Sequence, residues 1–505
     1  MQIVCTNGCR KMVELVAIKK TNQAGNMFRQ FALLITLTLL YAFCHGQVKP
    51  SSDSVTVPTS LKYKNPSFFK RLFLGKNYRA EWSTPVTVPV FYFSKSGLKI
   101  KELGGGQQTK SLQLEDKNGK KWVLRTVDKD VTLALPKWLR GTLAQSVVQD
   151  MVSGAHPHAP MVVAELAKAA GIVAPDPVMY YVADDDGLNP YKHFFVNTLC
   201  FLEEREPTRN NEETKNTENL VEDVFEENDH IVLQKELLKA RLLDMLVADW
   251  DRHEDQWRWA EKDSADVNYY YAIPRDRDQA FFYSKGLIVT IARWLALKHL
   301  VGFTYDTDKI KKLNYKAWGL DKTFLNELNS NDWQHTIDQF KASLTDEVIY
   351  RAVKDLPNAT YQISGSVIEK KLKSRRNDLS GDAMGYYRFL SKVVTVNGSD
   401  DEEIFRVSEN SGGLMVQVTN ASGKRIIYQR VFDDEETKQV VLNGFGKKDK
   451  FIVEDGVSSK IKLVINGGKG DDTYDIKGKI KNKVYDDKSE SNLFINSSRT
   501  KKRLK

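Results

Sequence analysis

Two acid-rich segments flank one predicted hairpin near the middle of the chain, and they restrict the fold more than any other feature. The first, DWDRHEDQ, covers residues 249–256 and directly follows 230–248, where apolar residues recur at helical spacing. The second, RDRDQAF, covers residues 275–281 and directly follows the apolar strand YYYAIP. Both sets of carboxylates therefore lie at the edge of a core, where such groups usually serve a function.

Phosphoryl transfer needs carboxylates in this arrangement. One carboxylate orients the acceptor hydroxyl, and the other holds the Mg²⁺ that bridges the phosphates. The alternative is a solvated loop of salt bridges, because arginines alternate with the aspartates in both segments. The helix and the strand that lead into the segments favour the first interpretation.

The pattern DxDRHxxQ followed by IPxDxDxAF resembles the catalytic and metal-binding segments of an atypical kinase-like fold. This fold is shared by HipA-type kinases, spore-coat CotH kinases, secretory-pathway casein kinases and phosphatidylinositol kinases. Upstream, GGGQQTKSLQLEDKNGKKWVLRTV is similar to the HipA-type pattern of a Gly-rich turn, a hairpin and a strand that carries the nucleotide-contacting cation. FLEE, at 201–204, resembles a hinge between lobes. The resemblance covers about residues 86–390.

By this resemblance, Asp251 would be the catalytic acid or base, with His253 as its structural companion. A divalent metal, Mg²⁺ or Mn²⁺, would be held by Asp276, Gln256 and Asp278.

ATP would be bound by the strand-rich part of the same region. Arg125 would contact the α- and β-phosphates, and Glu203 belongs to the implied hinge. Asp150 is preferred narrowly over Glu165 as the helical acid that would pair with Arg125. The remaining implied nucleotide contacts are Gly104, Gly105, Gly106 and Lys110.

Two residues depart from the pattern of these kinases. Gln256 stands where they usually have Asn or Glu, and Arg125 stands where they have Lys. Gln is one methylene longer than Asn, and Arg binds phosphate through a planar fork rather than as a point charge. The chain is therefore either an active kinase or a kinase-like scaffold without catalysis.

The predicted fold is α+β. A linker (47–85) with one short amphipathic piece precedes a strand-rich lobe (86–204), in which 143–171 reads as a helix. An acidic surface loop (205–229) leads to a helical lobe (230–392). We expect helix starts in the helical lobe at Asn331 and Thr345, and breaks near Pro357 and Gly381.

Residues 393–490 change to short β-rich runs between Gly, Asn and Asp, followed by a basic tail at 491–505. Four asparagines recur there every 23 residues, and an aromatic residue follows each of them by eight, so a β-solenoid or a regular β-sandwich is predicted, with chance as the alternative. The asparagines are Asn397, Asn420, Asn443 and Asn466, and the aromatics are Phe405, Tyr428, Phe451 and Tyr474.

The segment GGKGDDTYD (467–475) is close to a nonapeptide that binds Ca²⁺ in parallel β-rolls. One copy is not enough, because such a site takes ligands from two successive coils. A tight Gly-Asp turn is therefore preferred over Ca²⁺ at Asp471 and Asp472.

The N-terminus has the pattern of an export signal. After an upstream extension (1–26), residues 27–46 contain Arg29, a thirteen-residue apolar run and small residues before Gln47, where we expect cleavage. A retained membrane anchor and a lipid on Cys44 are weaker alternatives. Cleavage would leave Cys200 as the one cysteine of the mature chain, which excludes an internal disulfide. The protein is thus expected in the periplasm or at the outer membrane or cell surface.

The formal charge of +9 does not indicate nucleic acid as a partner. Residues 1–46 carry five Lys/Arg against one Asp/Glu, and the final RTKKRLK holds five more positive charges, so the rest is near neutral. The chain also resembles extracytoplasmic proteins of Gram-negative bacteria that place such a region between a metallophosphoesterase and a surface-antigen barrel, although neither flank is present. The expected partners are a nucleotide, a protein, lipid or sugar acceptor, and a surface partner for the β module.

Overall fold

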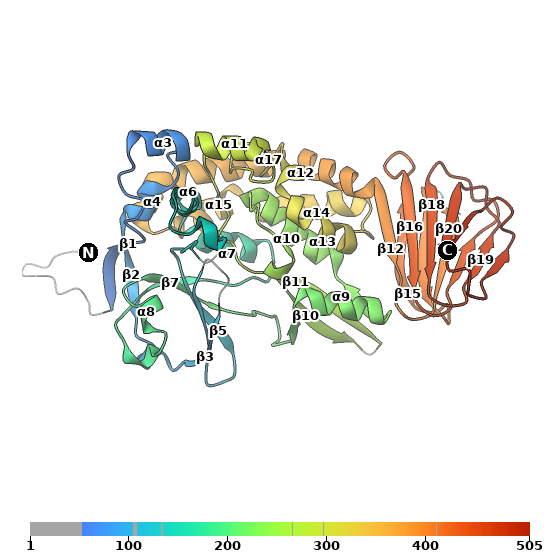
Figure 1. Ribbon diagram of the computed structural model, residues 1–505, viewed down its shortest axis with the longest axis horizontal. Helices are drawn as coiled ribbons and strands as arrows, with labels where there is room; N and C mark the ends of the chain where they lie inside the picture. The colour runs from blue at the N-terminus through green and yellow to red at the C-terminus, as the bar shows by residue number, and fades with distance from the viewer. Residues whose placement is uncertain (1–52, 105–108, 133–134, 265, 296, 411) are drawn as a thin grey trace, which may run out of the picture. The chain divides into compact units, whose positions relative to one another are not determined.

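The computed structural model describes residues 53–104, 109–132, 135–264, 266–295, 297–410 and 412–505. Residues 1–54 and 55–505 form two separate units, and the fold below is that of the second. The predicted signal segment and the turn glycines Gly105 and Gly106 lie outside the described residues. The fold is α+β, as predicted, with a strand-rich lobe, a helical lobe and an all-β module in chain order (Figure 1).

The strand-rich lobe is built on a seven-stranded sheet. Its strands β3, β4, β5, β7 and β6 pair antiparallel in that order, and β2 adds to β6 in parallel. Alternate side chains such as Leu112, Leu114 and Leu124 are buried, so one face of the sheet forms a core. The strands are β1 (Ser54–Pro58), β2 (Pro85–Phe91), β3 (Lys99–Gly104), β4 (Ser111–Glu115), β5 (Lys121–Thr126), β6 (Val178–Val182) and β7 (Leu199–Glu204), with helices α6 (Leu143–Met151) and α7 (Ala159–Ala169) between them.

Two segments expected to lack structure contain regular elements. In the expected linker, β1 joins the edge of the sheet, and α3 (Phe68–Leu74) and α4 (Arg79–Ser83) follow it. In the expected acidic loop, α9 (Thr217–Glu226) begins at Asn216, whose side chain accepts a hydrogen bond from the Asn219 amide. Leu220 is fully buried while the acids face solvent, so α9 is an amphipathic helix whose single apolar stripe is too narrow to stand out in the sequence.

The helical lobe packs around α10 (Gln234–Val247), which is buried along most of its length. Thr345 caps a helix as predicted, whereas the preceding helix is capped by Asn329 rather than starting at Asn331. Gly381 does not break its helix, because tertiary packing outweighs the roughly 1 kcal/mol helix penalty of one glycine. The other long helices are α14 (Ser330–Ser343), α15 (Asp346–Lys354) and α17 (Ser366–Ser391), and shorter ones are α11 (Leu287–Leu295), α12 (Ile310–Leu313), α13 (Trp318–Phe324) and α16 (Asn358–Thr360).

A four-stranded sheet carries the central hairpin. Its strands β10 (Trp257–Ser264) and β11 (Val267–Pro274) pair antiparallel, with Trp257 opposite Pro274. The shorter strands β8 (Thr214–Lys215) and β9 (His230–Val232) flank this pair. None of the helices in the described ranges is both long enough and apolar enough to span a bilayer.

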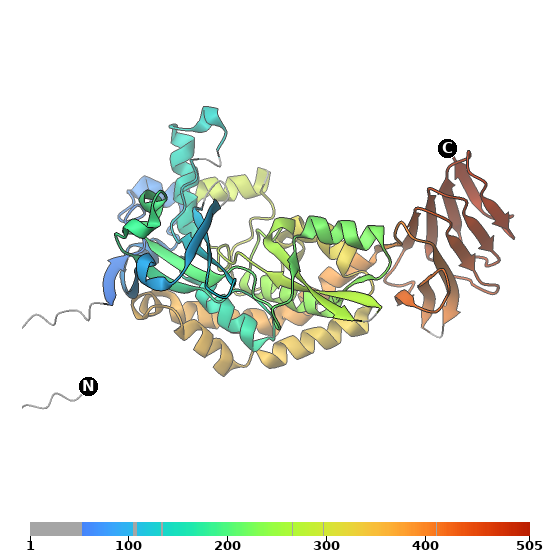
Figure 2. The same cartoon turned by 90° about the horizontal axis from the view of Figure 1, so that it is seen from below.

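The C-terminal module consists of two facing β-sheets, in which strands of successive coils pair in parallel (Figure 2). One sheet contains β12, β16, β18, β20 and β22, and the other contains β13, β17, β19 and β21 with the antiparallel strands β14 and β15 at its edge. The strands are β12 (Val393–Asn397), β13 (Glu403–Asn410), β14 (Gly413–Asn420), β15 (Ile426–Phe432), β16 (Gln439–Phe445), β17 (Lys450–Val453), β18 (Lys462–Gly468), β19 (Thr473–Ile476), β20 (Asn482–Asp486), β21 (Leu493–Ile495) and β22 (Lys501–Leu504). The expected basic tail therefore contributes two strands.

The predicted 23-residue period matches the length of the coil from Asn443 to Asn466, but the second predicted repeat, which begins at Asn420, is not a coil of its own. Asn397 pairs with Asn443 and Asn443 with Asn466, and the Asn443 and Asn466 amides each donate to the preceding Asn, at 2.7 and 2.6 Å. Asn420 and Tyr428 instead belong to the β14–β15 hairpin. Because of this hairpin, the first coil is twice as long as the next one. The asparagines therefore keep their 23-residue spacing in the sequence, although Asn420 does not stack on the others. The aromatic stack runs through Phe405, Phe451, Tyr474 and Phe494, with ring centroids 4.8, 5.3 and 4.7 Å apart.

Buried acids close the turns of this module. The Glu403 amide donates to Asp449 Oδ1 at 2.8 Å, and the Asp449 amide donates to Asp472 Oδ1 at 2.9 Å. A Cβ on Gly444 would lie 2.2 Å from Asp449 Oδ2, so only glycine fits beneath this carboxyl. Asp472 is thus a turn-closing acceptor, and Asp471 pairs with Lys448 at 3.4 Å.

The module should lose stability as the pH rises, because burial raises the pKa of Asp449 from 3.8 to about 9. The unfolded carboxyl ionises near pH 4 and the folded one only near pH 9, so this contribution is complete below pH 4 and is lost between the two values. We expect the free energy of unfolding, measured by urea titration, to fall across this range by at least about 1.4 kcal/mol, the equivalent of one pKa unit. Asp449→Asn keeps the acceptor and should flatten the profile. The exposed Asp455→Asn is the control, and an unchanged slope in Asp449→Asn would contradict the assignment.

Candidate active site

The hairpin register brings the two acid-rich segments together. Since Trp257 lies opposite Pro274, the residues just before β10 and just after β11 emerge at the same end. The Arg275 amide donates to the Gln256 carbonyl at 2.9 Å, and the Arg252 guanidinium donates to the Arg275 carbonyl. The segments 249–256 and 275–281 are therefore neighbours, as the sequence predicts.

A buried carboxylate at the end of α10 holds both segments. Asp244 pairs with Arg241 on its own helix, with Arg252 (Nε to Oδ2, 3.2 Å) of the first segment and with Arg277 of the second. All four side chains are at least 93% buried. The alternation of Asp and Arg is therefore not a solvated loop of salt bridges. Arg252 and Arg277 point inward, and this orientation leaves the aspartates between them at the surface of the site.

The sheet of the strand-rich lobe contacts the second segment through Arg125. Its Nη1 lies 3.0 Å from Asp276 Oδ1, and its Nη2 lies 3.0 Å from Glu203 Oε1 on the adjacent strand β7. Lys129, just beyond β5, forms an ion pair with Asp278. Two cations of one lobe thus meet two carboxylates of the other.

These charges separate the pKa values of the two neighbouring aspartates. Burial alone would raise the pKa of Asp276, but Arg125 and Lys129 outweigh it and hold this pKa well below its usual value. Burial and the adjacent Asp276 raise the pKa of Asp278. Burial likewise raises the pKa of Glu203, opposed by Arg125. Asp276 is therefore the more acidic of the two aspartates.

The backbone of this segment is unusual. Asp276 and Phe281 have positive φ angles of 54° and 60°, a region that residues other than glycine rarely adopt. Such strain is typically found at binding and catalytic sites. The Phe281 amide donates to the Val247 carbonyl at 2.9 Å, and Tyr78 Oη donates to the Phe281 carbonyl at 2.8 Å. These bonds fix the segment in its strained form.

Asp276, Asp278 and Gln256 fit a divalent metal by their chemistry. Mg²⁺ is usually bound by one or two carboxylates together with substrate phosphates. The two aspartates are close enough for the charge of Asp276 to raise the pKa of Asp278, and the buried Gln256 Oε1 has no hydrogen-bond partner among the described residues. An unpaired buried carbonyl is an oxygen donor without a present role, and the backbone of Gln256 is joined to the second segment by the hydrogen bond from the Arg275 amide.

Asp251 lies in the same electrostatic neighbourhood but has its own partner. It pairs with Lys316. Burial lowers the pKa of Arg252, and the charges of both Asp251 and Asp276 oppose this effect. Asp251 lines neither of the two cavities that border Arg125. His253 lies 3.6 Å from Asp255 in an exposed part of the loop.

The expected pairing of Asp150 with Arg125 is wrong. Asp150 is bound by Arg79 (Nη1 to Oδ1, 2.9 Å) and by Lys70 at 2.7 Å, both from the segment read as a linker. Glu165 pairs with Lys168 at 2.7 Å, so neither helical acid contacts Arg125. Arg125 instead contacts Asp276 and Glu203, the residue that the family resemblance assigns to a hinge.

The Gly-rich turn is described only at its ends. Gly104 ends β3, and Lys110 places its ammonium 5.3 Å from the ring centroid of Phe194.

Sequence reasoning missed Lys129, Asp249 and Lys316. Lys129 follows Arg125 by four residues in VLRTVDKD. This second cation just after the strand is a sequence signal that could have indicated it. Asp249 is buried beside Arg252, at 3.1 Å, and burial raises its pKa to about 6. Lys316 lies 65 residues from its partner Asp251, and no local pattern indicates it.

The site is closed. The cavities next to Arg125 have volumes of about 30 and 10 Å³, the first close to the volume of one water molecule. Ligand sites usually measure about 300–1,000 Å³. Neither of these two cavities has room for a nucleotide, so a nucleotide bound there would displace the ion pair of Arg125 with Asp276.

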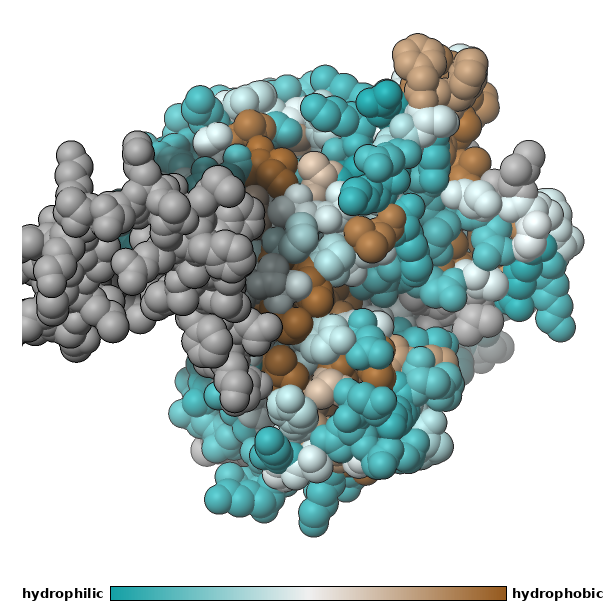
Figure 3. Space-filling model, turned by 90° about the vertical axis from the view of Figure 1, so that its left-hand side faces the viewer, coloured by the Kyte–Doolittle hydropathy of each residue, from teal (hydrophilic) through white to brown (hydrophobic). Residues whose placement is uncertain are grey.

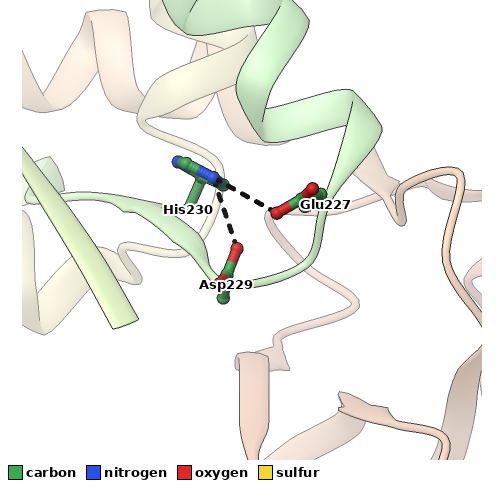
Figure 4. Close-up of side chains that lie close together, drawn as sticks. All are labelled: Glu227, Asp229 and His230. Atoms are coloured by element: carbon green, nitrogen blue, oxygen red, sulfur yellow. Dashed lines mark ion pairs between the residues drawn. The ribbon is translucent and has the colours of Figure 1, made fainter. Parts of the chain in front are cut away.

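A second group of possible metal ligands lies at the start of β9 (Figure 4). His230 Nε2 is 3.3 Å from Asp229 Oδ1 and 3.8 Å from Glu227 Oε2, and its Nδ1 is 2.8 Å from Tyr270 Oη. Glu227 is largely exposed, and the three residues form an ion-pair cluster. No residue of either acid-rich segment belongs to it.

Asp244→Asn should destabilise the protein by about 3–5 kcal/mol, because it removes the carboxylate that balances three buried guanidinium groups. Asn has the same size, so the loss would report on charge rather than packing. Urea unfolding measures the change. Asp186→Asn is the control, since Asp186 forms an exposed ion pair with Lys192 and should change stability by less than about 1 kcal/mol. Equal losses in both variants would refute the role given to Asp244.

Comparison with known proteins identifies no family. No family model and no curated protein matches the chain. Among solved structures it is similar to the Helicobacter pylori proinflammatory kinase CtkA, at 12% identity and a TM-score of 0.34, over 59% of this chain and 99% of that chain. It is also similar to the Rio2 kinase of Chaetomium thermophilum in an ADP/Mg²⁺-phosphoaspartate complex, at 12% identity and a TM-score of 0.27, over 59% and 83% of the two chains. At these scores neither likeness carries weight, and the functional argument stands on the geometry of the site.

Proposed function

We propose that the protein is an exported phosphotransferase that uses ATP and a divalent metal to phosphorylate a hydroxyl group. The contact that carries the proposal is the 3.0 Å ion pair between Arg125 and Asp276. It joins a strand of one lobe to a loop of the other, 151 residues further along the chain. A cation suited to phosphate and a carboxylate suited to a metal thus occupy one place.

The proposed binding step is an exchange of partners. Arg125 and Lys129 would turn from the carboxylates to the phosphates, and Asp276 and Asp278, with Gln256 Oε1, would hold the metal. The charge balance is kept, because the cationic side chains exchange a carboxylate for a phosphate and the carboxylates exchange a cationic side chain for the metal. Bound there, Mg²⁺ or Mn²⁺ would neutralise the charge that develops on the phosphates.

Asp251 is proposed to orient the acceptor hydroxyl. Its carboxylate is half-buried and held by Lys316, so an acceptor would replace this lysine as its partner. The buried Asp249 accepts a hydrogen bond from the Asp251 amide at 3.3 Å and fixes the backbone there. His253 would act as a companion at the loop surface. Protein, lipid and sugar hydroxyls all suit this role.

The location is proposed from the sequence alone. The export pattern of residues 27–46 places the protein in the periplasm or at the cell surface, with the β module as a docking element for a surface partner.

A second candidate is a non-catalytic interaction protein that keeps the same scaffold. It is favoured by the ion pairs of the site, because Asp251, Asp276 and Asp278 are all paired with cations of the chain. Arg125 and Gln256, the two departures from the kinase pattern, point the same way.

Two substitutions separate the roles of the acids. Asp251→Asn should reduce ATP turnover by at least about 100-fold while nucleotide binding persists, because the metal ligands remain. Asp276→Asn should weaken metal-dependent nucleotide binding together with turnover, because it removes the ionised metal ligand. Turnover is measured as ADP release with Mg²⁺ or Mn²⁺, and binding by calorimetry. Glu165→Gln, an exposed acid paired with Lys168, should change neither.

The scaffold would replace the enzyme if the unmodified protein binds nucleotide with neither metal. If both variants lose binding and thermal stability equally, the acids are structural anchors and have no catalytic role.

A further inference from the structure

Two helices of the first two lobes expose apolar side chains on the same side of the protein. On α3 every apolar residue except Leu74 is exposed, and on α11 only Val289 is fully buried. Exposure reaches 77% for Trp294 and 68% for Phe69. We call these residues the apolar ridge: Phe68, Phe69, Leu72, Phe73, Leu287, Ile288, Ile291, Trp294 and Leu295.

The two helices form one continuous face. They lie side by side in Figures 1 and 2, and Ser284 Oγ donates to the Leu74 carbonyl at 3.2 Å. A Cβ on Gly286 would lie 2.3 Å from the Leu74 carbonyl carbon, so glycine permits the start of α11 to contact the end of α3. Figure 3 shows brown apolar side chains exposed among hydrophilic ones, gathered at the upper right of the face in view. A contiguous apolar patch of this kind marks an interaction site rather than ordinary surface.

The surroundings of the ridge are basic. Residues 61–80 contain six Lys/Arg and no Asp/Glu. Residues 284–305 contain three Lys/Arg and no Asp/Glu. Some of these cations have partners within the protein, such as Lys70 and Arg79 on Asp150. The exposed ones are Lys62, which pairs with Asp128, and Lys64, Arg71, Lys76, Lys285 and Lys298.

Basic cavities border the ridge on both helices. One, of about 940 Å³, is lined by residues that include Lys64, Arg71, Lys76 and Lys371. Glu81 is the one acid among its described lining residues, and burial raises the pKa of this carboxyl. The other, of about 330 Å³, has Lys285, Arg293, Lys298, Lys309 and Lys312 in its lining and no acid among the described residues there. Both cavities therefore suit anionic groups that sit beside an apolar surface.

This combination matches a bilayer better than a second copy of the chain. Symmetric pairing of two such faces would bring like charges together around the apolar contact. The nine residues of α11 span about 14 Å, against roughly 30 Å of hydrocarbon, so the helix can lie in the interface but cannot cross it. Short amphipathic helices with aromatic residues on one face and Lys/Arg beside them bind membrane surfaces in this way.

We propose that the face formed by α3 and α11 docks the protein on a bilayer with anionic headgroups. The apolar ridge enters the boundary between headgroups and acyl chains, and the flanking lysines and arginines contact lipid phosphates. The inference is independent of the proposed catalysis.

The test is co-sedimentation of the full chain with phosphatidylglycerol/phosphatidylcholine vesicles, compared with vesicles of phosphatidylcholine alone. We expect binding to the anionic vesicles that weakens at high salt. Phe69→Glu and Trp294→Glu should each reduce it at least about tenfold, and Arg71→Glu should reduce the salt-dependent part. Leu493→Glu, at a residue of the β module with 53% exposure, is the matched control and should leave binding unchanged. Unchanged melting temperatures would show that the variants fold.

Three results would overturn the proposal. The first is equal binding to neutral and anionic vesicles. The second is binding that persists in the ridge variants, which would assign it to another segment such as the apolar run 31–43. The third is a dimer in sedimentation velocity that Phe69→Glu dissociates, which would identify a second copy as the occupant.

Discussion

The buried carboxylate of Asp244 is the interaction on which the rest of the site depends. It faces guanidinium groups from three segments, its own helix α10 and both acid-rich loops. Removing charges from water is costly unless each is paired, so the loops are stable only where Arg252 and Arg277 reach Asp244. That requirement places Asp249, Asp251, Asp276 and Asp278 on one side of the hairpin.

The sequence predicts this juxtaposition because it is nearly local. A helix, an acid-rich segment, a hairpin and a second acid-rich segment follow one another within 50 residues. The partners of the site residues come from far along the chain and leave no local pattern. Arg125 pairs with Glu203 rather than Asp150, because β5 and β7 are neighbours in the sheet whereas Asp150 faces Arg79 and Lys70. Similarly, the sequence does not reveal that Asn420 lies in a hairpin and does not stack on the other asparagines, because the hairpin keeps the 23-residue spacing.

The carboxylates of the site are already paired with cations of the same chain. Asp276 has Arg125, Asp278 has Lys129 and Asp251 has Lys316. The described cavities beside Arg125 are small, with volumes of about 30 and 10 Å³. In an enzyme the ion pairs would be the contacts that nucleotide, metal and acceptor replace one by one. In a scaffold they would be permanent. The difference between the two functions is thus the free energy needed to open these ion pairs.

A nucleotide-dependent melting temperature measures this most directly. If the pairs exchange for phosphates and metal, ATP with Mg²⁺ at 100 times its Kd should add about 2.7 kcal/mol of stability. The melting temperature of the unmodified protein should then rise with ATP and Mg²⁺ together, and much less with either alone. No shift at saturating ATP with either Mg²⁺ or Mn²⁺ would contradict a nucleotide site between Arg125 and Asp276.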